Sequence, residues 1–196
     1  AAMLGASDPR VAWIGMMAPA VADGVSLLVA QNEALQRAEG ESDESVEATI
    51  AFSRAVMPAA RDGDVELVAD LTTEFYRGVW DRLGEEGQAV AGDRETWAER
   101  TAEGQVELFT SDWFRSLLAY DPAVDWARVS VPVLAIFAGK DVQVVAEQNE
   151  TALREALAAS GNEDLEIITF EDANHLFQEA ETGAFSEYSR LEPAFV

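Results

Sequence analysis

The sequence contains no cysteine, one histidine (His175) and one lysine (Lys140) among its 196 residues. The lack of cysteine excludes disulfides, thiolate nucleophiles and iron–sulfur clusters. A single imidazole without thiolates also argues against a zinc site, and nothing in the sequence implies another cofactor. The cellular compartment stays open, because a secreted protein of this size can also fold without disulfides.

Positive charge is scarce. Lysine and arginine total 13 against 37 aspartate and glutamate residues, which gives a formal net charge of -24. Such a surface repels phosphate backbones and anionic lipid headgroups, so we expect neither nucleic-acid nor peripheral-membrane binding. With one lysine to twelve arginines, the composition fits either adaptation to high salt or a GC-rich genome.

Long hydrophobic runs are absent as well. The longest uncharged stretch, 11–22, is interrupted by Pro19 and is too short to cross a bilayer. Asp8-Pro9-Arg10 falls where the apolar part of a signal peptide would run. We therefore expect neither a membrane span nor a signal peptide.

Three short apolar segments predict the buried strands of a parallel sheet: 11–18, 132–138 and 165–170. The last of them partly alternates, which places it near a sheet edge. Between the second and third, apolar residues at helical spacing predict a helix over 145–159, ended by Ser160-Gly161-Asn162. A strand, a helix and a strand with short connections form a βαβ unit, so we predict the α/β class.

The region from 25 to 120 shows only helical patterns. We predict helices over 25–38, after the N-cap Ser42 and over 64–83. Pro58 and the cluster 61–64 should separate the second helix from the third, and three glycines between 84 and 92 mark a mobile stretch. Aromatic residues of this region are expected either to form its own core or to line an acyl pocket; they are Phe75, Tyr76, Trp80, Trp97, Phe109, Trp113 and Phe114.

Two residues that follow predicted strands carry the chemistry. Asp141 lies just after the predicted strand 132–138, and His175 follows 165–170. Both should therefore lie at the carboxyl edge of the sheet. A carboxylate bonded to one nitrogen of an imidazole fixes its tautomer and leaves the other nitrogen free to act as a base. Taken singly, each residue is better explained as structural: Asp141 as an aspartate in a turn or at a helix N-terminus, and His175 as a structural or surface histidine.

The sequence resembles the C-terminal half of an α/β-hydrolase-fold serine hydrolase, such as the esterases and peptidases related to serine aminopeptidases and dienelactone hydrolases. The segments that carry the resemblance are Val131–Asp141, Val144–Asn149 and Asp172–Phe177. The first 18 residues look like the helix after the nucleophile elbow and the strand that follows it. The resemblance implies that Asp141 is the acid and His175 the general base of a Ser-His-Asp triad. It also implies a division into hydrolase core (1–24), helical cap (25–120) and hydrolase core (121–196).

The nucleophile is the main departure from this family. No Gly-x-Ser-x-Gly motif occurs anywhere in the sequence, and Ser7 would fall at the far end of the elbow helix. We expect that the serine precedes Ala1, that the parent protein hydrolyses carboxylic esters and takes a small-molecule acyl ester as its substrate, and that this chain alone is inactive. A non-catalytic remnant or binding module, and a peptidase or thioesterase of the same fold, remain alternatives.

The partial α/β-hydrolase fold makes two structural predictions. Asp141 and His175 should lie within about 6 Å of each other, since a carboxylate–imidazole hydrogen bond requires it. The strand over 11–18 should lack a neighbour on one side, and such an open edge favours self-association.

Overall fold

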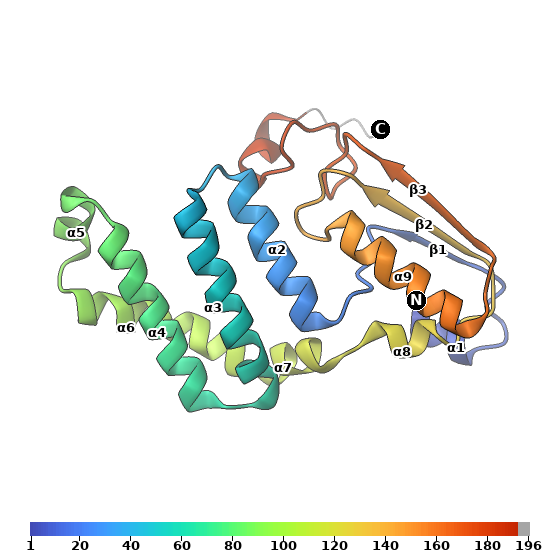
Figure 1. The fold of residues 1–196 in the computed structure, drawn as a ribbon, viewed down its shortest axis with the longest axis horizontal. Coiled ribbons are helices and arrows are strands. Elements are labelled where there is room, and N and C mark those ends of the chain that lie inside the picture. Colours follow the sequence, from blue (N-terminus) through green and yellow to red (C-terminus); the bar gives the residue numbers. More distant parts are fainter. Residues whose placement is uncertain (192–196) are drawn as a thin grey trace. The chain divides into compact units, whose positions relative to one another are not determined.

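The computed structural model of the chain describes residues 1–191 (Figure 1). They form two compact units, one made of residues 1–46 together with the segment from 121 onward, and one made of residues 47–120. The final five residues of the segment predicted as hydrolase core, 192–196, lie outside the described part. The two units are described separately below.

The first unit contains a parallel sheet of three strands in the order β1-β2-β3. The strands are β1 (Ile14–Met17), β2 (Val133–Ala138) and β3 (Leu165–Phe170). Its helices are α1 (Ala2–Ser7), α2 (Gly24–Ala38), α8 (Pro122–Trp126), α9 (Ala146–Ser160) and the 3-10 helix η1 (Phe185–Arg190). The predicted sheet of three parallel strands is thus confirmed, although the first strand is shorter than expected.

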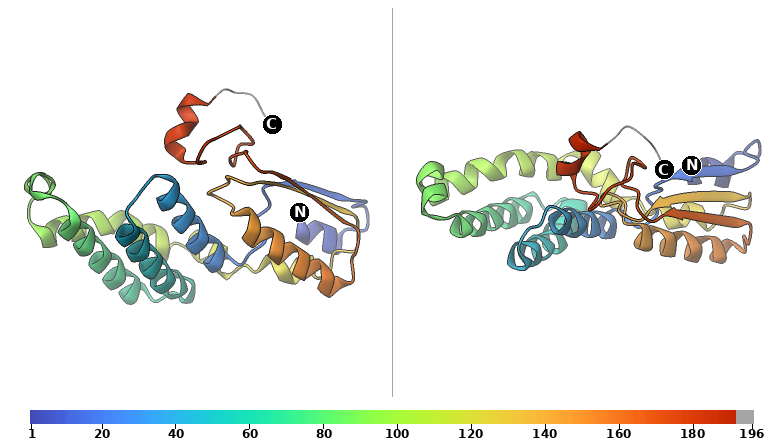
Figure 2. Two further views of the ribbon diagram at one scale, coloured as in Figure 1. Left: turned by 45° about the horizontal axis from the view of Figure 1, so that its top comes forward. Right: turned by 90° about the horizontal axis from the view of Figure 1, so that it is seen from above.

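One face of the sheet carries the core. Side chains of alternate strand residues pack with residues of α1, α8 and α9, and α9 lies along this face in Figure 1 and Figure 2. Phe137 on β2 and Leu153 and Leu157 on α9 are almost fully buried there. Burying such side chains stabilises the fold by about 1.5–3 kcal/mol each. This packing therefore holds the strands of the sheet in place.

The strand β1 forms an edge of the sheet. It pairs in parallel with β2, with Ile14 opposite Val133, and no second strand pairs with it among residues 1–191. Trp13 and Met17 are largely exposed beside this edge. The expected open edge is therefore present, while self-association through it remains a prediction.

The second unit is helical. It contains most of α3 (Asp43–Asp62), followed by α4 (Val65–Arg82), α5 (Glu85–Ala91), α6 (Arg94–Thr110) and α7 (Asp112–Ala119). Aromatic rings form part of its core: Phe52 stacks on Phe75 with centroids 4.3 Å apart and also lies near Phe109. The core-packing alternative for these aromatic residues therefore has direct support.

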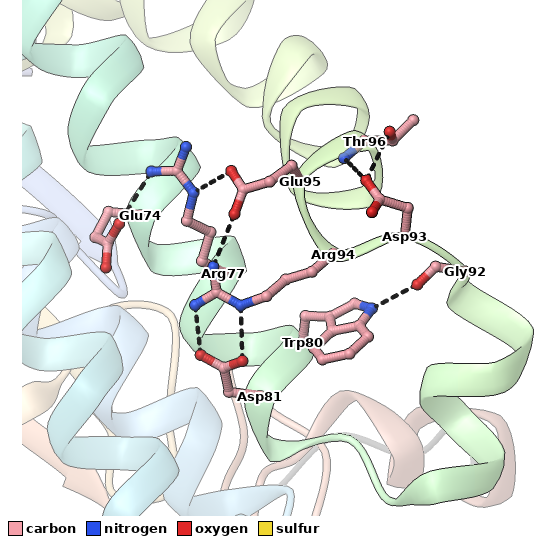
Figure 3. A network of polar contacts seen from close by, with 9 residues as sticks. All are labelled: Glu74, Arg77, Trp80, Asp81, Gly92, Asp93, Arg94, Glu95 and Thr96. Atoms are coloured by element: carbon pink, nitrogen blue, oxygen red, sulfur yellow. Dashed lines mark hydrogen bonds and ion pairs between the residues drawn. The ribbon is translucent and has the colours of Figure 1, made fainter.

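Charged side chains join α4 to the start of α6 (Figure 3). Arg94 makes two hydrogen bonds to the Asp81 carboxylate, at 2.7 and 2.6 Å, and Arg77 bonds to Glu95 at 2.8 Å. Trp80 adds a bond from its indole N–H to the carbonyl of Gly92. Partly exposed ion pairs contribute only about 0–1 kcal/mol each, so the network specifies the local geometry more than it stabilises the unit.

One prediction about the helical region is wrong in part. The second and third helices are separated within 61–64 as expected, where Gly63 has a φ of +79° that suits glycine. Pro58 does not contribute to this break, because it lies inside α3. The glycine-rich stretch from 84 to 92 contains the short helix α5, and its mobility remains a prediction.

The boundary of the units differs from the predicted cap. Residues 25–120 form helices with short connections and no strand, as expected, but α2 groups with the sheet and the division falls between residues 46 and 47. The upper boundary lies between 120 and 121, where the cap was predicted to end. The role of residues 25–120 as a cap remains a prediction.

Candidate active site

Parallel pairing of β2 with β3 brings the two predicted site residues to the same edge of the sheet. Ala138 pairs with Phe170 at the ends of the strands, and Asp141 and His175 follow shortly afterwards. The two loops are in close contact at Gly139, where an added Cβ would lie 2.5 Å from the carbonyl oxygen of Glu171. A residue with a side chain at 139 would therefore push the loops apart.

The carboxylate of Asp141 is held on both oxygens. Oδ1 accepts hydrogen bonds from the backbone N–H groups of Gln143 and Val144, both at 2.8 Å, and Oδ2 lies 2.8 Å from Nδ1 of His175. The Asp141 side chain is fully buried, whereas 28% of the His175 side chain is exposed. The carboxylate is thus fixed inside the protein and the imidazole faces outward from it.

This contact determines which ring nitrogen carries the proton. A carboxylate can only accept hydrogen bonds, so Nδ1 of His175 is the donor in the neutral ring. Nε2 then has a lone pair and can accept a proton from another group. The expected contact between the two predicted residues is present, and their catalytic roles are proposed below.

The loop that carries His175 is ordered by Asn174. This side chain is fully buried, and its Oδ1 accepts bonds from the backbone N–H groups of Leu176 and Gln178. Phe177 has a φ of +57° and packs with Ala138 and Ala173 under the loop. In the sequence, Asn174 lies within the segment Asp172–Phe177 and was not singled out. The signal that could have found it is that asparagine favours turns, where its side chain bonds the backbone two residues further on.

Two further residues adjoin the acid. Gln143 donates from its side chain to the hydroxyl of Tyr188 on η1, at 3.3 Å. Burial raises the pKa of Tyr188, the hydrogen bond from Gln143 lowers it, and the negative charge of Asp141 raises it. Neither residue stood out in the sequence, because Tyr188 is 45 residues beyond Gln143 and no local pattern links them.

The loop after β1 is fixed by a helix that follows the acid. Asn149 on α9 is fully buried, and its Oδ1 accepts bonds from the backbone N–H groups of Val21 and Ala22 at 2.7 and 3.0 Å. In the sequence, Asn149 is a polar residue on the apolar face of the helix predicted over 145–159. The structure shows that it holds the third loop at the carboxyl edge of the sheet.

Within residues 1–191, no group of three or more metal-ligating side chains gathers in one place. Over the same range, no helix has both the length and the apolar character that crossing a bilayer requires.

Comparison with known proteins relates this chain to hydrolases. The model of the "Prolyl oligopeptidase family" matches residues 87–195, more than half of the chain, including Asp141 and His175. "Esterase EstD" of Thermotoga maritima is 41% identical over 64 residues, which are 33% of this chain and 15% of that esterase.

A solved structure gives a weaker likeness. It is described as the "Crystal structure of esterase E22 L374D mutant", and it aligns with a TM-score of 0.38 at 12% identity over 95% of this chain. The aligned region is 53% of that chain. This chain therefore spans about half the length of esterase E22 and matches a much smaller share of EstD.

Proposed function

The chain belongs to the prolyl oligopeptidase family, and from this premise we propose that Asp141 and His175 are the acid and the general base of a serine hydrolase that cleaves carboxylic esters. The fold is the partial α/β-hydrolase fold expected from the sequence. The observation that carries the proposal is the 2.8 Å contact between His175 Nδ1 and the buried Asp141 carboxylate.

The proposed chemistry assigns one proton transfer to each step. Nε2 of His175 takes the proton of a serine hydroxyl as that oxygen attacks the ester carbonyl, and Asp141 stabilises the imidazolium that forms. His175 then protonates the departing alcohol. Water subsequently attacks the acyl-enzyme, with His175 again accepting a proton and returning it to the serine.

The nucleophile is proposed to come from outside these 196 residues, because the sequence contains no Gly-x-Ser-x-Gly. One donor of the oxyanion hole would be missing with it, since the backbone N–H of the residue after the serine supplies that donor. We therefore propose that the chain alone is inactive. The removal of a single oxyanion donor typically lowers kcat by about 100- to 1000-fold.

Backbone strain at the same edge supports a functional site. Among residues 1–191, the non-glycine residues with positive φ are Ala18, at +44° directly after β1, and Phe177, at +57° in the His175 loop. Such conformations cost about 1–3 kcal/mol each and cluster at active sites. Both lie at the carboxyl ends of strands, where α/β proteins place their sites.

Peptide or amide cleavage is the second candidate. The family is described as oligopeptidases, whereas the two similar proteins are described as esterases. All these reactions use the same nucleophile, acid and base, so the geometry of Asp141 and His175 does not separate them. We favour esters because EstD, which is 41% identical over 64 residues, is described as an esterase.

The test is a protein that carries this chain together with an upstream Gly-x-Ser-x-Gly segment of the same reading frame. We expect it to hydrolyse p-nitrophenyl acetate, to favour it over an aminoacyl p-nitroanilide, and to lose activity when His175 is replaced by alanine. A reading frame without the motif, or full activity of the His175→Ala variant, would overturn the proposal. A preference for the anilide would select the peptidase instead.

A further inference from the structure

Lys140 connects the loop of the acid to the loop of the histidine. It is the only lysine of the chain and precedes Asp141 directly. Its Nζ donates a hydrogen bond to the carbonyl of Ala180 at 2.6 Å and forms an ion pair with Asp172 at 3.0 Å. Its backbone N–H donates to the carbonyl of Ala173 at 2.9 Å.

These partners lie on both sides of His175. Asp172 and Ala173 enter the loop, Ala180 leaves it, and the N–H of Ala180 donates to the carbonyl of Asp172, which closes the base of the loop. The side chain of Lys140 therefore spans the two ends of the segment that carries the imidazole. The turn from Asn174 to Gln178 fills the space between these ends.

Gly183 lets the returning chain reach Lys140. Its φ is +79°, and an added Cβ would collide with the carbonyl oxygen of Lys140. Glu187 holds this position, because its carboxylate accepts bonds from the backbone N–H groups of Thr182 and Gly183. The main chain at Lys140 is thus enclosed by the histidine loop, and 29% of the lysine side chain remains exposed.

We propose that Lys140 is a positioning residue, which sets the imidazole of His175 against the Asp141 carboxylate by holding the histidine loop at its base. The role rests on the proposed function of that pair. An ammonium group has three donors and fits a carbonyl and a carboxylate at once, whereas the planar guanidinium of the twelve arginines has a fixed fork geometry. Both bonds involve a charged donor, so they are stronger than bonds between neutral groups.

The contacts of Lys140 affect how precisely His175 is positioned relative to Asp141. Asp141 directly follows Lys140 in the chain. The two contacts of the Lys140 ammonium group, called here the Lys140 clamp, therefore attach the histidine loop to the residue next to the acid. Displacement of a catalytic group by about 1 Å can lower a rate 100-fold. Without the clamp, we expect the loop to open more often and the Nδ1 proton of His175 to meet water more frequently.

The test uses the single histidine and the single lysine of the chain, each of which gives one isolated set of side-chain NMR signals. In the unmodified chain labelled with 15N, above the titration range of the imidazole, we expect a protonated Nδ1 and an unprotonated Nε2. We also expect nuclear Overhauser contacts from the Lys140 ammonium protons to Ala180. In Lys140→Met, the exchange of the Nδ1 proton with water should accelerate by at least about fivefold.

Two variants make the result specific. Asp172→Asn changes a mostly exposed side chain and keeps the bond to Ala180, so it should fold normally and accelerate exchange less than Lys140→Met does. Arg154→Met removes the same charge from the exposed pair with Glu150 on α9 and should leave the imidazole signals unchanged. Circular dichroism confirms that each variant is folded.

The proposal is overturned if folded Lys140→Met keeps the exchange rate of the unmodified chain, or if Arg154→Met accelerates it equally. If Lys140→Met does not fold, the ammonium contacts in the unmodified chain decide, and their absence overturns the proposal. These readouts need no turnover. Failure of the hydrolase proposal would appear in the ester assay alone, so the two results are distinguishable.

Discussion

Nδ1 of His175 lies 2.8 Å from Oδ2 of Asp141, although the two residues are 34 positions apart in the chain. The sheet explains their meeting, because β2 and β3 run parallel and end side by side. The acid receives two backbone hydrogen bonds on its other oxygen, so its orientation does not depend on the histidine. An imidazole placed against such a fixed acceptor has one defined tautomer.

Replacement of Asp141 by asparagine should remove this control of the tautomer. An amide presents both a donor and an acceptor, so the neutral His175 ring is no longer restricted to protonation at Nδ1. In a protein that also supplies the serine, we expect turnover to fall by about 10⁴-fold, as in other triads. In this chain, 15N NMR of the imidazole should show a change in the protonated nitrogen.

Asp164→Asn is the matched control. Asp164 is exposed and lies directly before β3, at the opposite end of the sheet from His175. The same change of charge and shape there should leave both the imidazole spectrum and the turnover unaltered. An unchanged rate in Asp141→Asn would mean that another carboxylate acts as the acid, for which Asp23 after β1 is the first alternative.

Asn149→Leu should destabilise the first unit. The substitution keeps the branched shape of the side chain but leaves the buried N–H groups of Val21 and Ala22 without their acceptor. Each unsatisfied buried group costs about 1–3 kcal/mol, so we expect the free energy of unfolding to fall by about 2–4 kcal/mol in urea titrations. Thr151→Ala, at an exposed position of the same helix, should change it by less than about 0.5 kcal/mol. Equal effects of the two substitutions would contradict the role assigned to Asn149.

The sequence predicted the parts of this site that depend on local pattern. Short apolar segments ended by breakers identified β2 and β3 closely, and the ends of those strands pointed to Asp141 and His175. The stop at Gly161 was also correct, since its positive φ ends α9. These features could be predicted because strand burial and helix termination depend on residues that are neighbours in the sequence.

Polar contacts between distant segments could not be predicted in the same way. Asn149 interrupts an apolar stripe, and only the folded chain shows that it bonds to a loop more than 120 residues earlier. The clamp at Lys140 likewise depends on a carbonyl 40 residues away. The prediction at Pro58 failed for a different reason. Proline usually ends or kinks a helix, but here α3 continues through it to Asp62.

Glu187 should make the loop after His175 sensitive to acid. Hydrogen bonds, the strongest from the Thr182 side chain, hold the pKa of this buried carboxyl below its usual value. A folded-state pKa below the unfolded one adds stability above about pH 4.3, the ordinary glutamate value, and the gain is lost as the pH falls through the folded-state pKa. Glu187→Gln should therefore lower the free energy of unfolding by about 1–2 kcal/mol at pH 7.

The same difference should shrink below about pH 4.3, because the Glu187 carboxyl of the unfolded chain takes up a proton there while the folded-state carboxyl still resists protonation. Urea titrations at micromolar protein concentration limit precipitation near the isoelectric point of about 4.1. Glu163→Gln changes an exposed glutamate and serves as the control, with little effect at either pH. A difference between Glu187→Gln and the unmodified chain that stays constant from pH 7 to 3.5 would refute the assignment.

The open edge of β1 should let two copies of the chain associate, and Met17→Lys should prevent it. Met17 is 62% exposed at this edge, and a lysine there blocks strand pairing because its charge cannot be desolvated between two sheets. Association must overcome the repulsion between two chains of net charge -24, so it should increase as salt shortens the Debye length from about 10 Å at 0.1 M to about 3 Å at 1 M. Sedimentation velocity at both salt concentrations measures the association of the chain.

Val90→Lys, at an 86% exposed position of α5, makes the same change of charge on the helical unit and should leave the association intact. A chain that stays monomeric at 1 M salt and high concentration would exclude this edge as a self-association surface.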